Sequence, residues 1–244
     1  MKIIQYQSSD WAKSASSYLL DAISDVLNNK KICHVMLTGG ETAEKLYLEL
    51  GKNPKLSELN GIQFYLGDER CVATDHPDSN LGMINRTLFI NKMSAGCHIY
   101  PMQADAYEQK KAASQYAKIL PEQLDIVIFG IGEDGHIASL FPGSKALRDD
   151  EESLVMPVVS PKKPHYRLTI TPRVISNAKS IFIIATGALK ANALYRMLSV
   201  NSKNDDFPLS YAINATWLVD SELTSECVSA HNICILEEKR FNFF

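Results

Sequence analysis

The chain has 244 residues, 45% of them hydrophobic, and a formal net charge of -3. This length and apolar content suffice for one large α/β domain, and the weak negative charge argues against a general nucleic-acid binder, which needs a basic surface. The five cysteines are scattered without metal-ligand spacing, and no apolar run approaches the length of a membrane span. Residues 1–10 lack the long apolar stretch of a secretion signal. We therefore expect a cytoplasmic protein that binds neither nucleic acid nor membrane.

Helical and strand patterns alternate along the chain. Apolar residues at helical spacing predict a helix over residues 11–29, and similar patterns predict helices over 42–50 and 188–198. Short apolar runs predict strands at 32–37, 62–66, 124–129 and 180–185. Strands that alternate with helices form parallel βαβ units. We therefore predict an α/β fold with a three-layer, doubly wound, mostly parallel Rossmann-like sheet and helices on both faces, as a single domain over residues 1–244.

One segment departs from this pattern. Residues 167–171 alternate polar and apolar side chains and lie between Pro164 and Pro172. A period of two is typical of a strand with one face in water, and proline favours the edge of a sheet. We expect an edge strand or an antiparallel strand here.

The loop from Thr38 to Thr42 contains Gly39 and Gly40 and leads from a predicted strand into a predicted helix. Free backbone N–H groups and the helix dipole at such a place favour an anion such as phosphate. A tight turn that needs glycine for its backbone angles is an equally good interpretation.

The most informative stretch is the glycine-rich loop at residues 130–143, which follows a predicted strand. Its spacing of glycines matches the dinucleotide fingerprint, but Phe141 and Pro142 interrupt the helix that such a site needs. Asp134 stands two residues before His136, so its carboxylate can orient the imidazole, whereas a lone histidine is more often structural. We predict that this pair is catalytic, and we expect no metal and no other cofactor.

Charged residues follow another predicted strand in the loop at residues 67–70, which contains Asp68 and Arg70. A solvated charge run is the ordinary interpretation, but a position at a strand end favours a functional one. Arg167 and Lys190 are isolated cations. Together with the Gly39–Gly40 loop they are suited to a phosphate clamp, with arginine as a bidentate fork and lysine as a point charge.

Read in order, several segments resemble the 6-phosphogluconolactonase family, which is related to glucosamine-6-phosphate deaminases and isomerases. These segments are residues 37–42, 67–70 with 78–80, 130–143, 167–171 and 187–191. The resemblance implies a sugar-phosphate site at the carboxyl edge of the sheet. The residues that it implies hold the phosphate are Gly39, Gly40, Thr42, Arg167 and Lys190. It further implies that His136 is the catalytic base and that Asp68, Arg70 and Asp134 surround the reacting end.

Two residues favour the lactonase branch over the deaminase branch. Deaminases carry a glutamate where this chain has Phe141, and an aromatic residue where it has Arg70. Glu41 departs from the usual lactonase pattern. A carboxylate so near a phosphate loop repels the ligand unless it points away. A deaminase or isomerase of amino-sugar phosphates and a non-catalytic sugar-phosphate sensor remain the alternatives.

The expected reaction is hydrolysis of 6-phospho-D-glucono-1,5-lactone in the oxidative pentose phosphate pathway. We expect His136 to accept a proton from the attacking water, with Asp134 or Asp68 orienting the imidazole. Arg70 or backbone N–H groups would then stabilise the oxyanion. The expected partner is a phosphorylated sugar lactone, and we expect a monomer or a weak homodimer.

Overall fold

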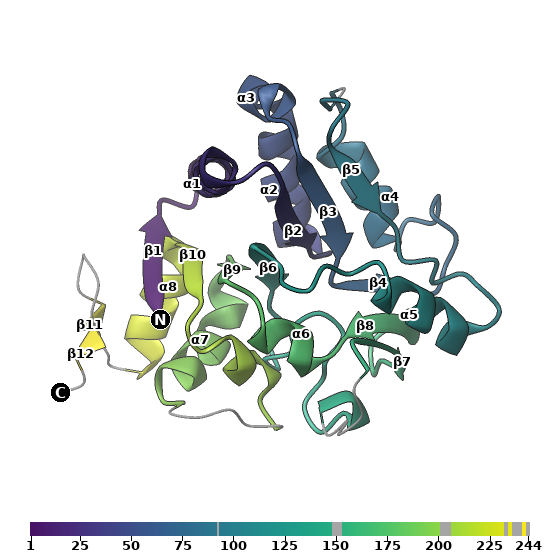
Figure 1. The fold of residues 1–244 in the computed structure, drawn as a ribbon. Coiled ribbons are helices and arrows are strands. Elements are labelled where there is room, and N and C mark those ends of the chain that lie inside the picture. Colours follow the sequence, from purple (N-terminus) through teal and green to yellow (C-terminus); the bar gives the residue numbers. More distant parts are fainter. Residues whose placement is uncertain (92, 148–152, 201–205, 232–233, 236–240, 243–244) are drawn as a thin grey trace.

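The computed structural model describes residues 1–91, 93–147, 153–200, 206–231, 234–235 and 241–242. Its centre is a seven-stranded sheet in which every neighbouring pair of strands is parallel. In spatial order the strands are β1 (Lys2–Tyr6), β10 (Thr216–Asp220), β9 (Ser180–Ala185), β6 (Ile126–Gly130), β2 (Cys33–Leu37), β3 (Ile62–Leu66) and β5 (His98–Tyr100). A two-stranded antiparallel pair, β11 (Cys234–Ile235) and β12 (Phe241–Asn242), lies near the C-terminus (Figure 1).

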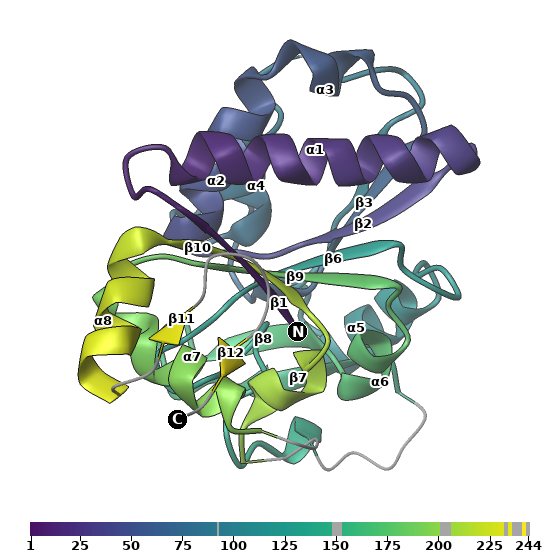
Figure 2. The ribbon, with the colours of Figure 1, turned by 90° about the vertical axis from the view of Figure 1, so that its left-hand side faces the viewer.

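Helices cover both faces of the large sheet, as Figures 1 and 2 show. One face carries α1 (Trp11–Asn29), α2 (Glu41–Lys52), α3 (Pro54–Glu58) and α4 (Asn80–Thr87). The other carries α6 (Pro172–Ser176), α7 (Ala191–Leu198), α8 (Ser221–His231) and a small sheet that α5 (Gln109–Ala117) contacts. Three short 3-10 helices are η1 (Lys145–Leu147), η2 (Ala188–Lys190) and η3 (Pro208–Ala212). The predicted three-layer, doubly wound fold class is confirmed.

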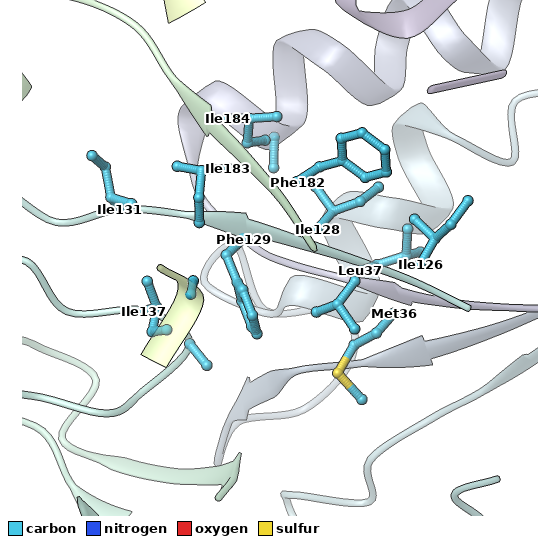
Figure 3. Close-up of a cluster of buried hydrophobic side chains, with 14 of the residues drawn as sticks. Met36, Leu37, Ile126, Ile128, Phe129, Ile131, Ile137, Phe182, Ile183 and Ile184 are labelled. Atoms are coloured by element: carbon cyan, nitrogen blue, oxygen red, sulfur yellow. The ribbon is translucent and has the colours of Figure 1, made fainter. Parts of the chain in front are cut away.

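The core explains why the central strands are mostly apolar. All five residues of β3 are buried, and so are the first four of β6, because both faces of these strands are covered. Figure 3 shows that Ile128 and Phe129, neighbours in β6, point to opposite sides of the strand. On the helical side, α1 buries Trp11, Ala15 and Leu19 at intervals of four residues. Within the described residues, no helix is both long and apolar enough to cross a membrane.

The winding of the sheet reverses between β2 and β6. From β2 the chain proceeds outward through β3 to β5, then returns to β6 on the other side of β2 and continues to β9 and β10. The loops after β2 and β6 therefore run to opposite faces of the sheet and diverge at its carboxyl edge. Such a topological switch point is where open α/β sheets bind ligands.

A small antiparallel sheet closes one side of this edge and corrects two expectations. Its order is β4 (Asp68–Arg70), β8 (Tyr166–Ile170) and β7 (Val155–Val159), so the predicted loop at 67–70 contains a strand. The strand expected at 167–171 is antiparallel, but it is the central strand and not an edge. Its polar side is not wet either, because Arg167 is 5% exposed and Thr169 is 0% exposed. The prediction of one domain over residues 1–244 stays a prediction.

Candidate active site

A cleft of about 420 Å³ opens at the switch point between β2 and β6. It is lined by eight of the nine residues that the sequence nominated, which are Gly39, Gly40, Thr42, Asp68, Arg70, His136, Arg167 and Lys190. The ninth, Asp134, lies behind His136 and contacts its ring. Two other cavities, of about 480 and 670 Å³, contain none of the nine. Among the described residues, no three His, Cys, Asp or Glu side chains cluster as a metal site would require.

The imidazole of His136 is held by Asp134, with 2.5 Å between His136 Nδ1 and Asp134 Oδ1. Burial alone would raise the pKa of Asp134, but the hydrogen bond and charge of His136 outweigh it and lower that pKa to about 2. An ionised carboxylate can only accept, so Nδ1 carries the hydrogen of this bond. The neutral ring then has its lone pair on Nε2, which is the nitrogen free to take a proton from a water molecule.

The loop around this pair is compact because it lacks a side chain at Gly132. The amide of Gly132 donates to the carbonyl of His136 at 3.0 Å, and the amide of Gly135 donates to the carbonyl of Gly132 at 3.0 Å. A Cβ atom at Gly132 would lie 2.0 Å from His136 Nδ1 and 2.4 Å from Asp134 Oδ1. Phe141 also packs against the ring, with 4.4 Å between ring centroids. The imidazole is therefore held by a hydrogen bond and by a ring contact.

Asp68 lines the same cleft but does not hold the imidazole. It is 4% exposed, its Oδ2 accepts from the Ser139 hydroxyl at 2.5 Å, and its Oδ1 accepts from Asn80 Nδ2 at 3.2 Å. Arg167 Nη1 lies 3.9 Å from Oδ2. Of the two carboxylates proposed to orient the catalytic ring, only Asp134 contacts it, and Asp68 is the buried counter-ion of Arg167.

The guanidinium of Arg167 was expected to be free to bind phosphate through two nitrogens, but it is already hydrogen-bonded to the protein. Its Nε donates to the carbonyl of Pro164 at 2.9 Å, its Nη2 to that of Lys162 at 3.3 Å, and its Nη1 to Ser139 Oγ at 3.3 Å. Burial lowers the pKa of Arg167, while the Asp68 carboxylate opposes that shift. Because all three nitrogens already donate to protein oxygens, a phosphate could meet a spare Nη1 hydrogen, but a two-pronged contact would break existing bonds.

A further set of contacts in the cleft joins α2 to the segment before α7. Lys190 Nζ donates to Thr42 Oγ1 at 3.1 Å, and Thr42 Oγ1 lies 3.3 Å from Thr186 Oγ1. Burial lowers the pKa of Lys190, and the nearby Glu41 carboxylate opposes this. The residue before α2, Gly40, has a φ of +98° and no side chain to cap the helix, so the N-terminal amides stay open to an anion.

Gly39 needs its lack of a side chain for a different reason. A Cβ atom there would lie 1.9 Å from Asn80 Oδ1. The amide nitrogen of this asparagine also donates to the Asp68 carbonyl at 2.8 Å. Gly39 therefore lets the loop at residues 38–42 pack directly against Asn80, which holds Asp68.

Arg70 reaches the cleft from β4. Its Nη1 donates to the carbonyl of Asp78 at 2.6 Å, whereas its buried Nε has no hydrogen-bond partner among the described residues. The neighbouring Glu69 is 3% exposed and points away from this chemistry, since its carboxylate accepts from the amides of Asn80 and Leu81 at 2.8 Å each. Of these two neighbours, Arg70 is therefore available to a ligand and Glu69 is not.

These observations place a hydrogen-bonded His–Asp pair and a lysine–threonine pair in one cleft at the switch point. The model of the family described as glucosamine-6-phosphate isomerases/6-phosphogluconolactonase matches residues 6–219. The chain belongs to this family. The resemblance drawn from the motifs is thus confirmed.

Curated members of the glucosamine-6-phosphate isomerase/6-phosphogluconolactonase family are similar over most of the chain. The 6-phosphogluconolactonase 3 of Saccharomyces cerevisiae is 30% identical over 222 residues, which cover 84% of this chain and 88% of the yeast protein. The 6-phosphogluconolactonase of Haemophilus influenzae is 30% identical over 181 residues, covering 72% and 77%. These relatives confirm the expectation of an enzyme of the 6-phosphogluconolactonase type.

Solved structures of the family share the fold. A 6-phosphogluconolactonase from Leishmania guyanensis has a TM-score of 0.74 at 26% identity, covering 94% of this chain and 98% of that chain. A monomeric glucosamine-6-phosphate deaminase has a TM-score of 0.78 at 23% identity, covering 93% and 100%. Because both branches superpose well, the fold does not separate lactonase from deaminase, and the distinction depends on side chains such as Phe141.

Eight cleft residues were not predicted as site residues, namely Thr38, Glu41, Gly130, Ile131, Gly132, Glu133, Ala138 and Lys162. Ser139 and Asn80 were also missed as supports of Asp68, although both stand inside segments that resemble the family. Lys162 was the hardest of these residues to predict from the sequence. It lies in a proline-flanked stretch that predicted only a strand boundary.

Proposed function

We propose that this chain hydrolyses 6-phospho-D-glucono-1,5-lactone to 6-phospho-D-gluconate. The names of the similar curated proteins support this reaction. The observation that carries the proposal is the 2.5 Å contact between His136 and Asp134, which leaves Nε2 free in a cleft that Lys190 and Thr42 also line. A base and a phosphate-binding cation in one cleft suit a substrate with its phosphate on C6 and its carbonyl on C1.

In the proposed reaction, His136 Nε2 takes a proton from water as the water oxygen forms a bond to C1. The imidazolium is stabilised by the ionised Asp134, and negative charge collects on the carbonyl oxygen near Arg70. The bond between C1 and the ring oxygen then breaks, and the imidazolium returns the proton to that oxygen. The new carboxylic acid loses its own proton to solvent. A general base of this kind accelerates a reaction by about 100- to 10,000-fold.

Phe141 supports the lactonase assignment over the deaminase one. The ring packs against His136 at 4.4 Å and is 6% exposed, so this position offers an apolar surface and no proton carrier. The deciding experiment incubates the purified protein with 6-phosphogluconolactone and, separately, with glucosamine 6-phosphate. We expect 6-phosphogluconate from the first and no ammonia from the second. Ammonia release would establish the deaminase, and binding of 6-phosphogluconate without acceleration would establish a sensor.

Replacing Lys190 by alanine should weaken substrate binding at the phosphate end. A hydrogen bond to a charged group contributes about 1.5–3 kcal/mol, so we expect KM for the phosphorylated lactone to rise about 10- to 100-fold with a smaller change in kcat. Hydrolysis of the unphosphorylated lactone should be unaffected. Lys190 is a cleaner probe than Arg167, since truncating Arg167 also leaves Asp68 buried without its counter-ion. An equal loss on both lactones would refute the phosphate role.

Replacing Glu41 by glutamine should strengthen binding of the same substrate. Glu41 begins α2, is exposed, and lines the cleft beside the bond between Thr42 and Lys190. Its negative charge opposes that of a phosphate, but solvent screens an exposed carboxylate, so we expect KM to fall only about 2- to 5-fold. Glu44 is also exposed in the first turn of α2 and does not line the cleft, so Glu44→Gln is the control. The two variants should differ at low salt and converge at high salt.

The remaining expectations about this protein's setting stay predictions. These are a cytoplasmic location, the absence of nucleic-acid partners, and a monomeric or weakly dimeric state. Size-exclusion chromatography with light scattering tests the last of them.

A further inference from the structure

The loop between β7 and β8 is closed by its own hydrogen bonds. The amide of Ser160 donates to the carbonyl of His165 at 2.6 Å, and the His165 ring nitrogen Nδ1 lies 2.9 Å from the carbonyl oxygen of Ser160. Within the loop, the amide of Lys162 donates to Ser160 Oγ at 3.0 Å. The main chain at Lys162 is therefore fixed by contacts that do not involve the lysine side chain.

The same loop is joined to the cleft by Arg167. This arginine donates from Nε to the Pro164 carbonyl at 2.9 Å and from Nη2 to the Lys162 carbonyl at 3.3 Å. Since Arg167 is 5% exposed and belongs to the central strand of the small sheet, it is a rigid base for the loop. The position of Lys162 relative to His136 is thereby set by the fold.

The side chain of Lys162 is exposed, yet it lines the cleft together with His136 and Arg167. Within the described residues its ammonium has no ion-pair partner within 4.0 Å. The charge of Lys162 acts on Asp134. Burial raises the pKa of Asp134, and after His136 the Lys162 ammonium is among the groups that lower it. Lys162 is therefore a cation without an ion-pair partner in the cleft that His136 lines, and its charge acts on Asp134.

We propose that Lys162 is a further substrate-binding residue, whose ammonium holds the C1 oxygen on which negative charge develops and which becomes part of the product carboxylate. The inference rests on the proposed lactone hydrolysis and extends it to the reacting end of the substrate. Lys190 is already paired with Thr42 at the start of α2 and is assigned to the phosphate, so a second cation is free to recognise the carbonyl. A flexible ammonium suits this task, because the oxygen changes from neutral to anionic during the reaction.

The test compares Lys162→Gln with Lys163→Gln. Both lysines are exposed neighbours in one loop, but Lys163 does not line the cleft. The loop's main-chain bonds do not use either ammonium, so both variants should melt at the wild-type temperature. We expect Lys162→Gln to lower kcat about 10- to 100-fold, less than the loss typical of a buried oxyanion donor because the residue is exposed. Lys163→Gln should keep wild-type kcat.

Calorimetry with two product-like ligands identifies the atom that Lys162 holds. The ligands are 6-phosphogluconate, with a carboxylate at C1, and glucitol 6-phosphate, with a hydroxyl there. We expect Lys162→Gln to weaken the first about 10-fold or more, as the loss of a hydrogen bond between charged groups does, and to leave the second unchanged. Equal weakening of both would assign Lys162 to the phosphate, and no weakening of either would remove it from the site. Both results overturn the proposal.

These measurements also separate the inference from the reaction that it extends. If the wild-type protein binds 6-phosphogluconate more tightly than glucitol 6-phosphate through Lys162 but does not accelerate lactone hydrolysis, the lactonase proposal fails and the binding role of Lys162 stands. If hydrolysis is accelerated and Lys162→Gln behaves like wild type in both assays, only the inference fails.

Discussion

Replacing His136 by alanine should lower kcat for 6-phosphogluconolactone by about 100- to 10,000-fold, the range supplied by a general base. Affinity for 6-phosphogluconate should change little, because the Thr42–Lys190 pair that we assign to the phosphate is untouched by the substitution. The substitution removes a side chain that lines the cleft and is hydrogen-bonded to Asp134. Catalysis and binding should therefore separate.

The measurement needs the spontaneous rate subtracted at each pH, since the lactone also opens unaided. His98 is an exposed histidine in β5, outside the cleft, so His98→Ala controls for the loss of an imidazole as such. Normal turnover by His136→Ala would show that the base lies elsewhere. A parallel loss of affinity and kcat would indicate that the loop at residues 130–143 had lost its shape.

Replacing Gly132 by alanine should impair turnover almost as strongly without touching any reacting group. The added Cβ would lie 2.0 Å from His136 Nδ1, so the ring and Asp134 must separate or turn. A displacement of about 1 Å at a catalytic group can cost about 100-fold in rate, and we expect a loss of kcat of that size.

Gly130 is a matched control two residues earlier. A Cβ there would meet the Gly39 carbonyl oxygen at 3.7 Å, which is an ordinary van der Waals contact. Gly130→Ala should therefore keep most of the activity, and both variants should retain cooperative thermal unfolding. Full activity in Gly132→Ala would mean that the contact between His136 and Asp134 does not matter for turnover.

The central strands and the main helices could be predicted because their patterns are local. Strand β3 is apolar at four of its five positions, and α1 repeats its buried residues at helical spacing. The strands β1 and β10 were not predicted. Their pairing joins residues more than 200 positions apart, and β1 is a sheet edge with partly exposed residues, so only the tertiary structure makes it a strand.

In the candidate site, too, the local contacts could be predicted from the sequence and the long-range ones could not. Asp134 and His136 are two residues apart, so a contact between them could be expected from the sequence. The contact of Asp68 with Arg167 depends on the pairing of β4 with β8, and its contact with Ser139 joins β4 to the loop after β6. No local pattern reports that pairing. For that reason Arg167 was expected to be a free fork, whereas it holds the carbonyls of a neighbouring loop.

A pH-controlled time course of 6-phosphogluconolactone, followed by NMR with and without the wild-type protein, tests most directly whether this cleft accelerates opening of a phosphorylated lactone. We predict conversion to 6-phosphogluconate well above the spontaneous rate, with a smaller acceleration for the unphosphorylated lactone. A time course that coincides with the spontaneous reaction would contradict the account.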